Sequence, residues 1–180
     1  MKENKKIWLS SPHMGGGEIE LVQEAFDANW IAPAGPHINN FEQQLSRVSQ
    51  SFNVVALSSG TSAIHLALIL LGVQNDDNVI CSSFTFSASA NPIKYIGANP
   101  IFIDSESESW NMCPDLLNNA IQDGIKNNKK PKAIILVHLY GMPARIDELI
   151  AVANKFEVPI IEDAAEALGS KYKNQPLGTF

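Results

Sequence analysis

A serine- and threonine-rich segment that follows an apolar run has the residue types of an anion site. It reads Ser58-Ser59-Gly60-Thr61-Ser62. Gly60 lets the backbone come close to a ligand, and the first amides of a helix that begins here have no intrahelical acceptor. Together with the helix dipole and the hydroxyls of Thr61 and Ser62, these amides suit a phosphate. The structural alternative is a plain Ser/Thr N-cap.

Carboxylates follow a second apolar run, Pro159–Ile161, as Glu162, Asp163 and Glu166. Acids at the C-terminal end of a parallel strand face the crevice where open α/β sheets bind their ligands. The small side chains between them leave room for a ligand. One acid could serve only as a helix N-cap, but a second acid at Glu166 makes that explanation incomplete.

Phe86 and His138 also follow apolar runs, after Cys81 and Val137. Aromatic residues in such places normally belong to the core, but beside a phosphate site Phe86 becomes a candidate to stack on a flat ring. A lone histidine is usually structural, and the four histidines lack metal-ligand spacing. The chain contains neither a Walker loop, nor a GxGxxG turn, nor a GxSxG nucleophile elbow.

The elements that must position these residues alternate between short apolar runs and amphipathic helical stripes. This alternation predicts an α/β fold: an open, mainly parallel sheet with helices on both faces. One helical stripe is Ile64, Leu68 and Leu71, followed by Gly72 as a C-terminal cap; a later one is Ile146, Leu149, Ile150 and Ala153. We expect Gly60, Phe86, His138 and Asp163 at one edge of the sheet. The strand candidates are Val54–Leu57, Val79–Cys81, Ile101–Asp104, Ala133–Val137 and Pro159–Glu162.

The chain divides by pattern into residues 1–36, an N-terminal helix and a loop, and residues 37–180, the sheet-forming region. The loop Trp30–Pro36 is apolar yet rich in Pro and Gly. Such a loop either covers the core or takes part in binding. At the other end, Lys171–Gly178 reads as a hairpin whose returning strand has barely begun, so we expect a truncated chain.

Composition narrows the functional classes. Of the 180 residues, 45% are hydrophobic, and 13 basic against 19 acidic residues give a net charge of −6. This charge argues against a broad basic surface for nucleic acid. The apolar stretches fall short of the roughly 20 residues that cross a bilayer, and the first residues do not read as a signal peptide. We therefore expect a soluble, cytoplasmic protein without nucleic-acid or membrane partners.

These segments, in this order, resemble the DegT/DnrJ/EryC/StrS sugar-nucleotide aminotransferases, which are fold-type-I pyridoxal-phosphate enzymes. The resemblance runs from Leu9 to Phe180. The matching motifs are SSGTSAIHLAL, SSFTFSAS, GANPIFID, VHLYGMP and IIEDAAEALGS.

The resemblance implies pyridoxal 5′-phosphate as cofactor and a role for each residue of the predicted site. Gly60, Thr61 and Ser62 would hold the phosphate, and Phe86 would stack on the pyridine ring. Asp163 would pair with the ring nitrogen, and Glu166 would lie near the phenolic oxygen. Many members of the family carry Gln or His where this chain has Glu166.

The opening segment is most similar to the branch that aminates 4-keto-6-deoxy nucleotide sugars, such as the UDP-N-acetylbacillosamine transaminases. There, the stretch matching Asn29, Trp30, Ile31 and Ala32 touches the nucleotide sugar. The resemblance implies a UDP-4-keto-6-deoxy sugar as substrate, glutamate as amino donor and a role in surface-glycan or glycoprotein sugar synthesis. It also implies a homodimer, with the Trp30–Pro36 loop near the partner subunit.

In the resembling family the Schiff-base lysine lies beyond the motif that begins at Gly178. Lys171 and Lys173 stand on a predicted hairpin and are poor substitutes, so we expect the chain alone to be inactive. Two other readings stay open: a sugar dehydratase of the same fold that uses a histidine in place of the lysine, and a non-catalytic half-domain.

Overall fold

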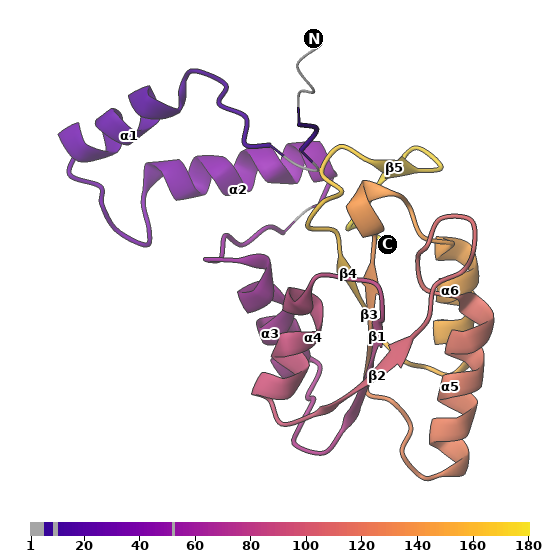
Figure 1. The fold of residues 1–180 in the computed structure, drawn as a ribbon. Helices are drawn as coiled ribbons and strands as arrows, with labels where there is room; N and C mark the ends of the chain where they lie inside the picture. Colours follow the sequence, from indigo (N-terminus) through magenta and orange to yellow (C-terminus); the bar gives the residue numbers. More distant parts are fainter. Residues whose placement is uncertain (1–5, 9–10, 52) are drawn as a thin grey trace. The chain divides into compact units, whose positions relative to one another are not determined.

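The computed structural model describes residues 6–8, 11–51 and 53–180, and its contacts divide the chain into residues 1–42 and 43–180. Figure 1 labels the elements. The functional division expected after Pro36 stays a prediction. The helices are α1 (Glu18–Asp27), α2 (Pro36–Ser49), α3 (Gly60–Leu70), α4 (Ser87–Tyr95), α5 (Pro114–Lys126) and α6 (Ile146–Lys155), with a 3-10 turn, η1, at Leu139–Gly141. The strands are β1 (Asn78–Ser82), β2 (Asn99–Ile103), β3 (Ala133–Val137), β4 (Ile160–Asp163), β5 (Lys171–Tyr172) and β6 (Gln175–Pro176).

Residues 43–180 contain a four-stranded sheet in the order β2-β1-β3-β4, and every neighbouring pair is parallel. The chain moves from β1 to β2 in one direction and then crosses to β3 on the other side of β1. The order therefore reverses between β1 and β3, and such a switch point is where open α/β sheets bind ligands. The predicted α/β fold with a parallel sheet is confirmed.

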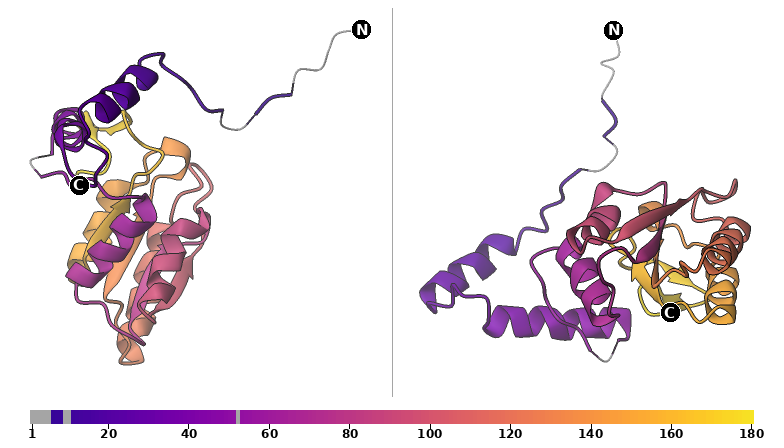
Figure 2. Two further views of the ribbon diagram at one scale, coloured as in Figure 1. Left: turned by 90° about the vertical axis from the view of Figure 1, so that its left-hand side faces the viewer. Right: turned by 90° about the horizontal axis from the view of Figure 1, so that it is seen from below.

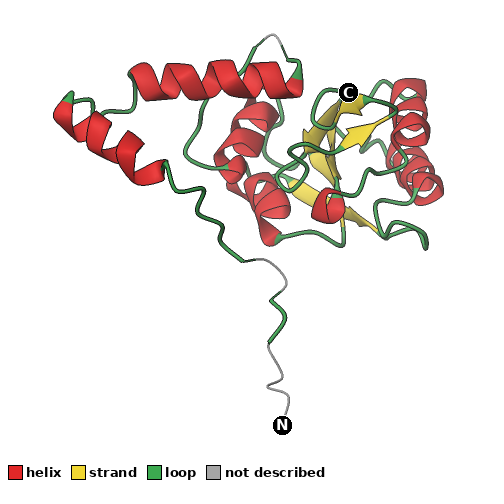
Figure 3. Ribbon diagram, turned by 90° about the horizontal axis from the view of Figure 1, so that it is seen from above, coloured by secondary structure: helices red, strands yellow, loops and turns green. Residues whose placement is uncertain are grey.

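Helices cover both faces of the sheet because the strand residues alternate between two cores. Val79, Cys81 and Ile135 pack with Ile64 of α3 and Ile93 of α4. The residues between them, such as Ile80 and Ile134, pack with apolar residues of α5 and α6. All five residues of β3 are buried, as expected for a strand covered on both faces. Figures 2 and 3 show the sheet between α3 and α4 on one side and α5 and α6 on the other.

The local sequence explains where the helices form. α5 has Pro114 at its start, where a proline ring costs no hydrogen bond, and it buries Leu117 and Ile121, which lie four residues apart. α6 buries Ile146, Leu149 and Ala153 in the same way. In α3, Ile64 and Leu68 are buried and Gly72 follows the helix at φ +72°. The predicted stripe is wrong at Leu71, which is 39% exposed because it lies one residue beyond the helix.

The predicted strand Val54–Leu57 is absent, although its residues are described. A strand needs a hydrogen-bonded neighbour, and within the described part of the chain this segment pairs with neither edge of the sheet. Val55 and Leu57 are accordingly exposed, at 72% and 44%.

The predicted hairpin forms as β5 and β6, which pair antiparallel. Its tip residues, Lys173 and Asn174, have φ of +47° and +69°, as a tight two-residue turn requires. Among the described residues, none of the helices is both long and apolar enough to pass through a membrane. The expected cytoplasmic location stays a prediction.

Candidate active site

The residues that the sequence singled out gather at the carboxyl edge of the sheet in residues 43–180. Phe86 follows β1, His138 follows β3 and Asp163 ends β4. Because these strands are parallel, their C-terminal ends share one edge. The beginning of α3 lies at the same edge, since Ile64, one turn after Gly60, packs with Val137 and Ile161. The expected placement of these four residues at one edge is confirmed.

The start of α3 presents an open helix end. Ser59 is the N-cap, and its Oγ accepts the amide of Ser62 at 3.1 Å. The Ser62 hydroxyl lies 3.2 Å from that of Ser58 and 3.0 Å from that of Ser59. The amides of Gly60 and Thr61 precede the first intrahelical hydrogen bond and point out of the helix end. A Cβ added at Gly60 would meet no atom within 4 Å, so the space beside this end is open to a ligand.

Phe86 is 81% exposed, so its ring does not belong to the core, which was the structural alternative to stacking. Its role in stacking on a cofactor stays a prediction. The residue is the N-cap of α4, with extended φ and ψ of −69° and 144°. This backbone conformation ends the loop and leaves the ring outside the core. An unpacked aromatic ring at a ligand-binding edge can stack on a flat group.

The Asp163 carboxylate is held from both sides. Its Oδ2 accepts a hydrogen bond from the Ser89 hydroxyl at 2.6 Å, and its Oδ1 accepts one from the Ala165 amide at 3.3 Å. Ser89 in turn lies 2.7 Å from the Thr85 hydroxyl. Neither hydroxyl was singled out from the sequence. The available signal was the spacing of three residues between Phe86 and Ser89, which brings both to the first turn of one helix.

Glu166 contacts the backbone of η1, where its Oε2 accepts the amide of Tyr140 at 3.0 Å. Tyr140 has φ +50° in the left-handed region, an unfavourable conformation for a tyrosine. Gly141 follows at φ +79°, and a Cβ there would lie 2.7 Å from the Glu166 carbonyl oxygen. Glu166 therefore braces a strained turn, a structural role that the sequence did not indicate.

His138 and Glu162 form a buried pair with side chains 0% and 7% exposed. His138 Nδ1 accepts the Ala144 amide at 3.2 Å, so the ring proton lies on Nε2 and points to Glu162 Oε1, 2.8 Å away. Glu162 also accepts the amides of Gly178 at 2.9 Å and Phe180 at 2.8 Å. Burial acts to raise the pKa of Glu162, but the hydrogen bonds from His138, Phe180 and Gly178 outweigh it, so the pKa is lowered. The structural interpretation of His138 agrees with these contacts.

The residues expected to touch the substrate lie in the separate unit of residues 1–42. Asn29 has φ +55°, and its amide donates to Phe26 O at 3.0 Å as the chain leaves α1. The Trp30 ring packs on Gly35, where an added Cβ would lie 2.9 Å from Trp30 Cε3. Trp30 and Ile31 are 50% and 64% exposed. The roles of Asn29, Trp30, Ile31 and Ala32 in binding a nucleotide sugar stay predictions.

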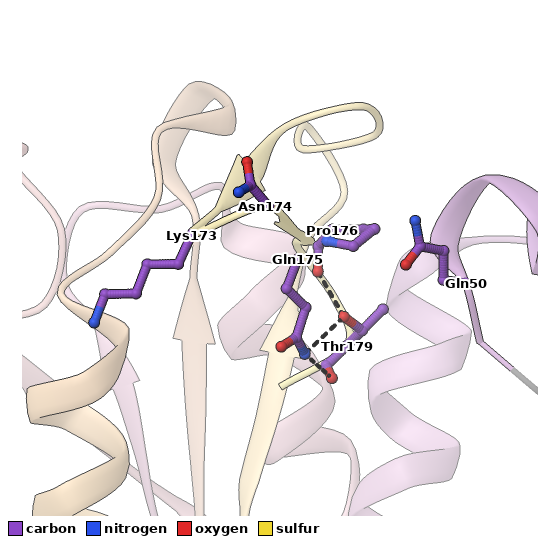
Figure 4. A pocket seen from close by; sticks show the side chains of 6 residues that line it. All are labelled: Gln50, Lys173, Asn174, Gln175, Pro176 and Thr179. Carbon is purple, nitrogen blue, oxygen red and sulfur yellow. Dashed lines mark hydrogen bonds between the residues drawn. The ribbon is translucent and has the colours of Figure 1, made fainter.

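A polar cavity of about 400 Å³ lies beside the hairpin but involves none of the predicted site residues. Figure 4 shows Gln175 donating to the carbonyl and hydroxyl oxygens of Thr179, while the Lys173 side chain extends away from Gln50. No described group of three His, Cys, Asp or Glu residues could hold a metal ion. The cavity is lined by Gln50, Lys173, Asn174, Gln175, Pro176 and Thr179.

Known proteins are similar to this chain in sequence and in fold. EpsN of Bacillus subtilis (strain 168), described as a pyridoxal phosphate-dependent aminotransferase, is 51% identical over 177 residues, covering 98% of this chain and 46% of EpsN. GDP-perosamine synthase of Escherichia coli O157:H7 is 42% identical, covering 98% of this chain and 47% of that enzyme. The chain thus spans about half the length of the curated relatives it matches.

A solved structure extends the likeness to three dimensions. Spr1654 of Streptococcus pneumoniae, described as a sugar aminotransferase and solved in its PMP form, superposes with a TM-score of 0.83 at 34% identity. The match covers 94% of this chain and 45% of that structure. The model of the DegT/DnrJ/EryC1/StrS aminotransferase family matches residues 12–180. Since that match takes in the whole sheet and every segment of the carboxyl edge, the chain belongs to this family.

Proposed function

We propose that this chain forms the cofactor-binding part of a pyridoxal-phosphate-dependent aminotransferase that acts on nucleotide sugars. One observation carries the proposal: an open helix end, an exposed aromatic ring and a hydrogen-bonded carboxylate meet at one edge of a parallel sheet. These three groups match the three parts of the cofactor, namely its phosphate, its ring face and its ring nitrogen. The residues present therefore fit pyridoxal phosphate.

The phosphate is assigned to the start of α3. The outward amides of Gly60 and Thr61 and the hydroxyls of Thr61 and Ser62 are donors placed where the helix dipole favours an anion. Ser59 already caps the helix, so the remaining donors are not needed for capping. The N-cap and the anion site are thus compatible in one structure.

The ring is assigned to Phe86 and Asp163. Phe86 would supply a face for stacking, and the Asp163 carboxylate would keep a proton on the pyridine nitrogen. When bound, pyridoxal phosphate supplies an electron-accepting ring for the removal of a proton beside an amino group. Asp163 would support that chemistry by stabilising the positive charge of the protonated ring nitrogen. Glu166 is assigned to the side of the phenolic oxygen, although its Oε2 also accepts the Tyr140 amide.

The finer assignments come from the resemblance and from the relatives. We propose amino transfer from glutamate to a 4-keto-6-deoxy nucleotide sugar, in the synthesis of sugars for surface glycans. The stretch from Asn29 to Ala32 is assigned to the nucleotide sugar. A homodimer is proposed as well, supported by the apolar loop Trp30–Pro36, of which Trp30 and Ile31 are at least half exposed.

Titration of the chain with pyridoxal phosphate, followed by near-ultraviolet circular dichroism, tests the cofactor site. We expect Asp163→Asn and Phe86→Ala each to weaken binding about tenfold, because each removes one contact worth about 1–2 kcal/mol. Glu148→Gln, which changes an exposed residue of α6, should bind as the wild type does. Binding that is absent, or that ignores both site variants, would refute the cofactor assignment.

Product formation tests the substrate class in the whole protein. Glutamate would be supplied with either a UDP-linked or a GDP-linked 4-keto-6-deoxy sugar. The UDP-linked sugar is the substrate that the resemblance implies. The GDP-linked sugar is included because the Escherichia coli relative is named GDP-perosamine synthase. Amino transfer to neither sugar would contradict the proposed substrate class while leaving the cofactor site intact.

A further inference from the structure

A chain of two hydroxyls leads from the first turn of α4 to the carboxylate at the end of β4. Ser89 Oγ lies 2.6 Å from Asp163 Oδ2 and 2.7 Å from Thr85 Oγ1. Ser89 is only 1% exposed, so water cannot replace either partner. The contact with Asp163 joins residues 74 positions apart. It therefore fixes two elements relative to each other.

The direction of the two hydrogen bonds between Thr85, Ser89 and Asp163 follows from which groups carry a proton to donate. An ionised carboxylate only accepts hydrogen bonds, so Ser89 must donate its single hydroxyl proton to Asp163. The Ser89 oxygen is then left as an acceptor, and Thr85 must donate to it. Each group consequently has one orientation, with the protons running from Thr85 through Ser89 to Asp163.

The same helical turn carries the exposed aromatic residue. Phe86 is the N-cap of α4, and its carbonyl accepts the Ser89 amide at 3.0 Å. Ser89 thus contacts the Phe86 backbone through its amide and the Asp163 side chain through its hydroxyl. One residue therefore links the backbone of Phe86, whose ring would stack on the cofactor, to the acid that would meet the cofactor nitrogen.

We propose that Ser89 is a positioning residue, oriented by Thr85, that sets the Asp163 carboxylate relative to Phe86 for binding the cofactor ring. The inference rests on the proposed function, because the ring nitrogen is the group that Asp163 is positioned to meet. Ser89 donates to Oδ2, and among the described residues Oδ1 accepts a hydrogen bond from the Ala165 amide at 3.3 Å. Restricting the rotation of the carboxylate in this way would lower the entropic cost of presenting an oxygen to the ring nitrogen on binding.

The test compares Ser89→Ala and Thr85→Val with Ser82→Ala. Ser82 is a fitting control because it is a buried serine at the end of β1 whose Oγ has no hydrogen-bond partner in the described structure. The first readout needs no cofactor: nuclear magnetic resonance couplings report the χ1 rotamer of Asp163. We expect one rotamer in the wild type and in Ser82→Ala, and averaging in Ser89→Ala.

The second readout uses pyridoxine 5′-phosphate, which has the ring and phosphate but no aldehyde and therefore binds without a covalent bond. In Ser89→Ala we expect about tenfold weaker binding, from the loss of a hydrogen bond to a charged group. The pH at which the ¹⁵N-labelled ring nitrogen loses its proton should fall by about one unit, the shift equivalent to that tenfold change. Thr85→Val should move both quantities in the same direction by less.

The outcomes separate the two proposals. If the wild type binds the probe but Ser89→Ala matches Ser82→Ala in rotamer, affinity and ring-nitrogen titration, the positioning role is refuted and the proposed function stands. If the wild type binds no probe, the proposed function fails and this role fails with it. A weakened Ser89→Ala that keeps a single Asp163 rotamer and an unchanged nitrogen titration would also refute positioning, because a merely structural defect would have that signature.

Discussion

Replacing Glu162 with glutamine tests the hydrogen-bond cluster in which this buried carboxylate joins His138, after β3, to the segment after β6. Oε1 accepts from His138 Nε2 at 2.8 Å and from the Gly178 amide at 2.9 Å, and Oε2 accepts from the Phe180 amide at 2.8 Å. All three partners donate. A carboxylate can satisfy them, whereas a glutamine has one acceptor oxygen and an NH₂ group that only donates.

The structure sets the size of the effect. In its favoured orientation, the side-chain amide introduced by Glu162→Gln would keep its oxygen at the position of Oε1 and turn its NH₂ toward Phe180. Two charge-assisted hydrogen bonds would then become neutral ones, a loss of about 1 kcal/mol each. The Phe180 amide can bond to water instead, because that contact is exposed. We therefore expect Glu162→Gln to lower the free energy of unfolding by about 2 kcal/mol.

The pH dependence of that loss has a definite sign. The pKa of Glu162 is lowered in the folded state from its ordinary value of 4.5. A carboxyl with a depressed folded pKa stabilises the fold fully above its unfolded pKa and loses this contribution as the pH falls through the folded pKa. The stability difference between wild type and Glu162→Gln should thus be complete above about pH 4.5 and shrink below it.

Urea denaturation measures the difference, and amide hydrogen exchange at Gly178 and Phe180 locates it. Glu148→Gln is the matched control: it removes the same charge from an exposed pair with Arg145, in which the Arg145 and Glu148 side chains are 45% and 52% exposed. Exposed pairs contribute only about 0–1 kcal/mol. If Glu162→Gln were no more destabilising than this control and left the two amides equally protected, the assigned role of the cluster would be wrong.

Three further outcomes are expected. Gly141→Ala should destabilise the chain by about 2–3 kcal/mol, because the added Cβ would strain the left-handed backbone and also lie 2.7 Å from the Glu166 carbonyl oxygen. Gly169→Ala should cost about 1 kcal/mol, because Gly169 has φ +92° but open space around it. Equal urea midpoints for the two variants would contradict this. Burial, reinforced by the charge of Asp163, raises the pKa of Cys81 to about 12. Iodoacetamide at pH 8 should therefore alkylate Cys113 in the folded chain and Cys81 only after unfolding. Labelling of Cys81 in the folded chain, detected by mass spectrometry, would refute this expectation. Lys171 and Lys173 are exposed on the hairpin, and pairing with Asp147 raises the pKa of Lys173. Borohydride reduction with pyridoxal phosphate should therefore leave no stoichiometric adduct on either lysine, and a full adduct found by mass spectrometry would contradict the assignment.

The strands that the sequence predicted correctly are those that pair with a neighbouring strand in the four-stranded sheet. Ala133–Val137 is apolar throughout because two helical layers cover it, and the structure forms that strand at the predicted bounds. Val54–Leu57 has a similar composition but pairs with no strand that the structure describes, so composition alone misled. Apolar content indicates burial, whereas a strand also needs a hydrogen-bonding neighbour, and no local pattern specifies one.

The site shows the same division between local and long-range information. Phe86 and Asp163 could be placed at one edge because each follows or ends an apolar run that forms a strand, which is a local property of the pattern. Gly60 follows a run that forms no strand, and its helix α3 brings it to the same edge by packing on the sheet. Ser89 was missed because its partner lies 74 positions away, and a serine in a helix gives no sign of which carboxylate it will meet. The pairing of Glu162 with His138 was missed for the same reason, although the sequence marks each of the two residues separately.

The hydroxyl chain of Thr85 and Ser89 has a consequence for how the charge state of this edge can be observed. Both hydroxyl protons point toward Asp163 only while that carboxylate is an acceptor. A proton placed on Oδ2 makes Asp163 a donor, and each hydroxyl must then turn to point back along the chain. The positions of the Thr85 and Ser89 hydroxyl hydrogens therefore depend on the charge of the Asp163 carboxylate. Neutron diffraction locates deuterium directly and would show that charge without any cofactor or substrate present.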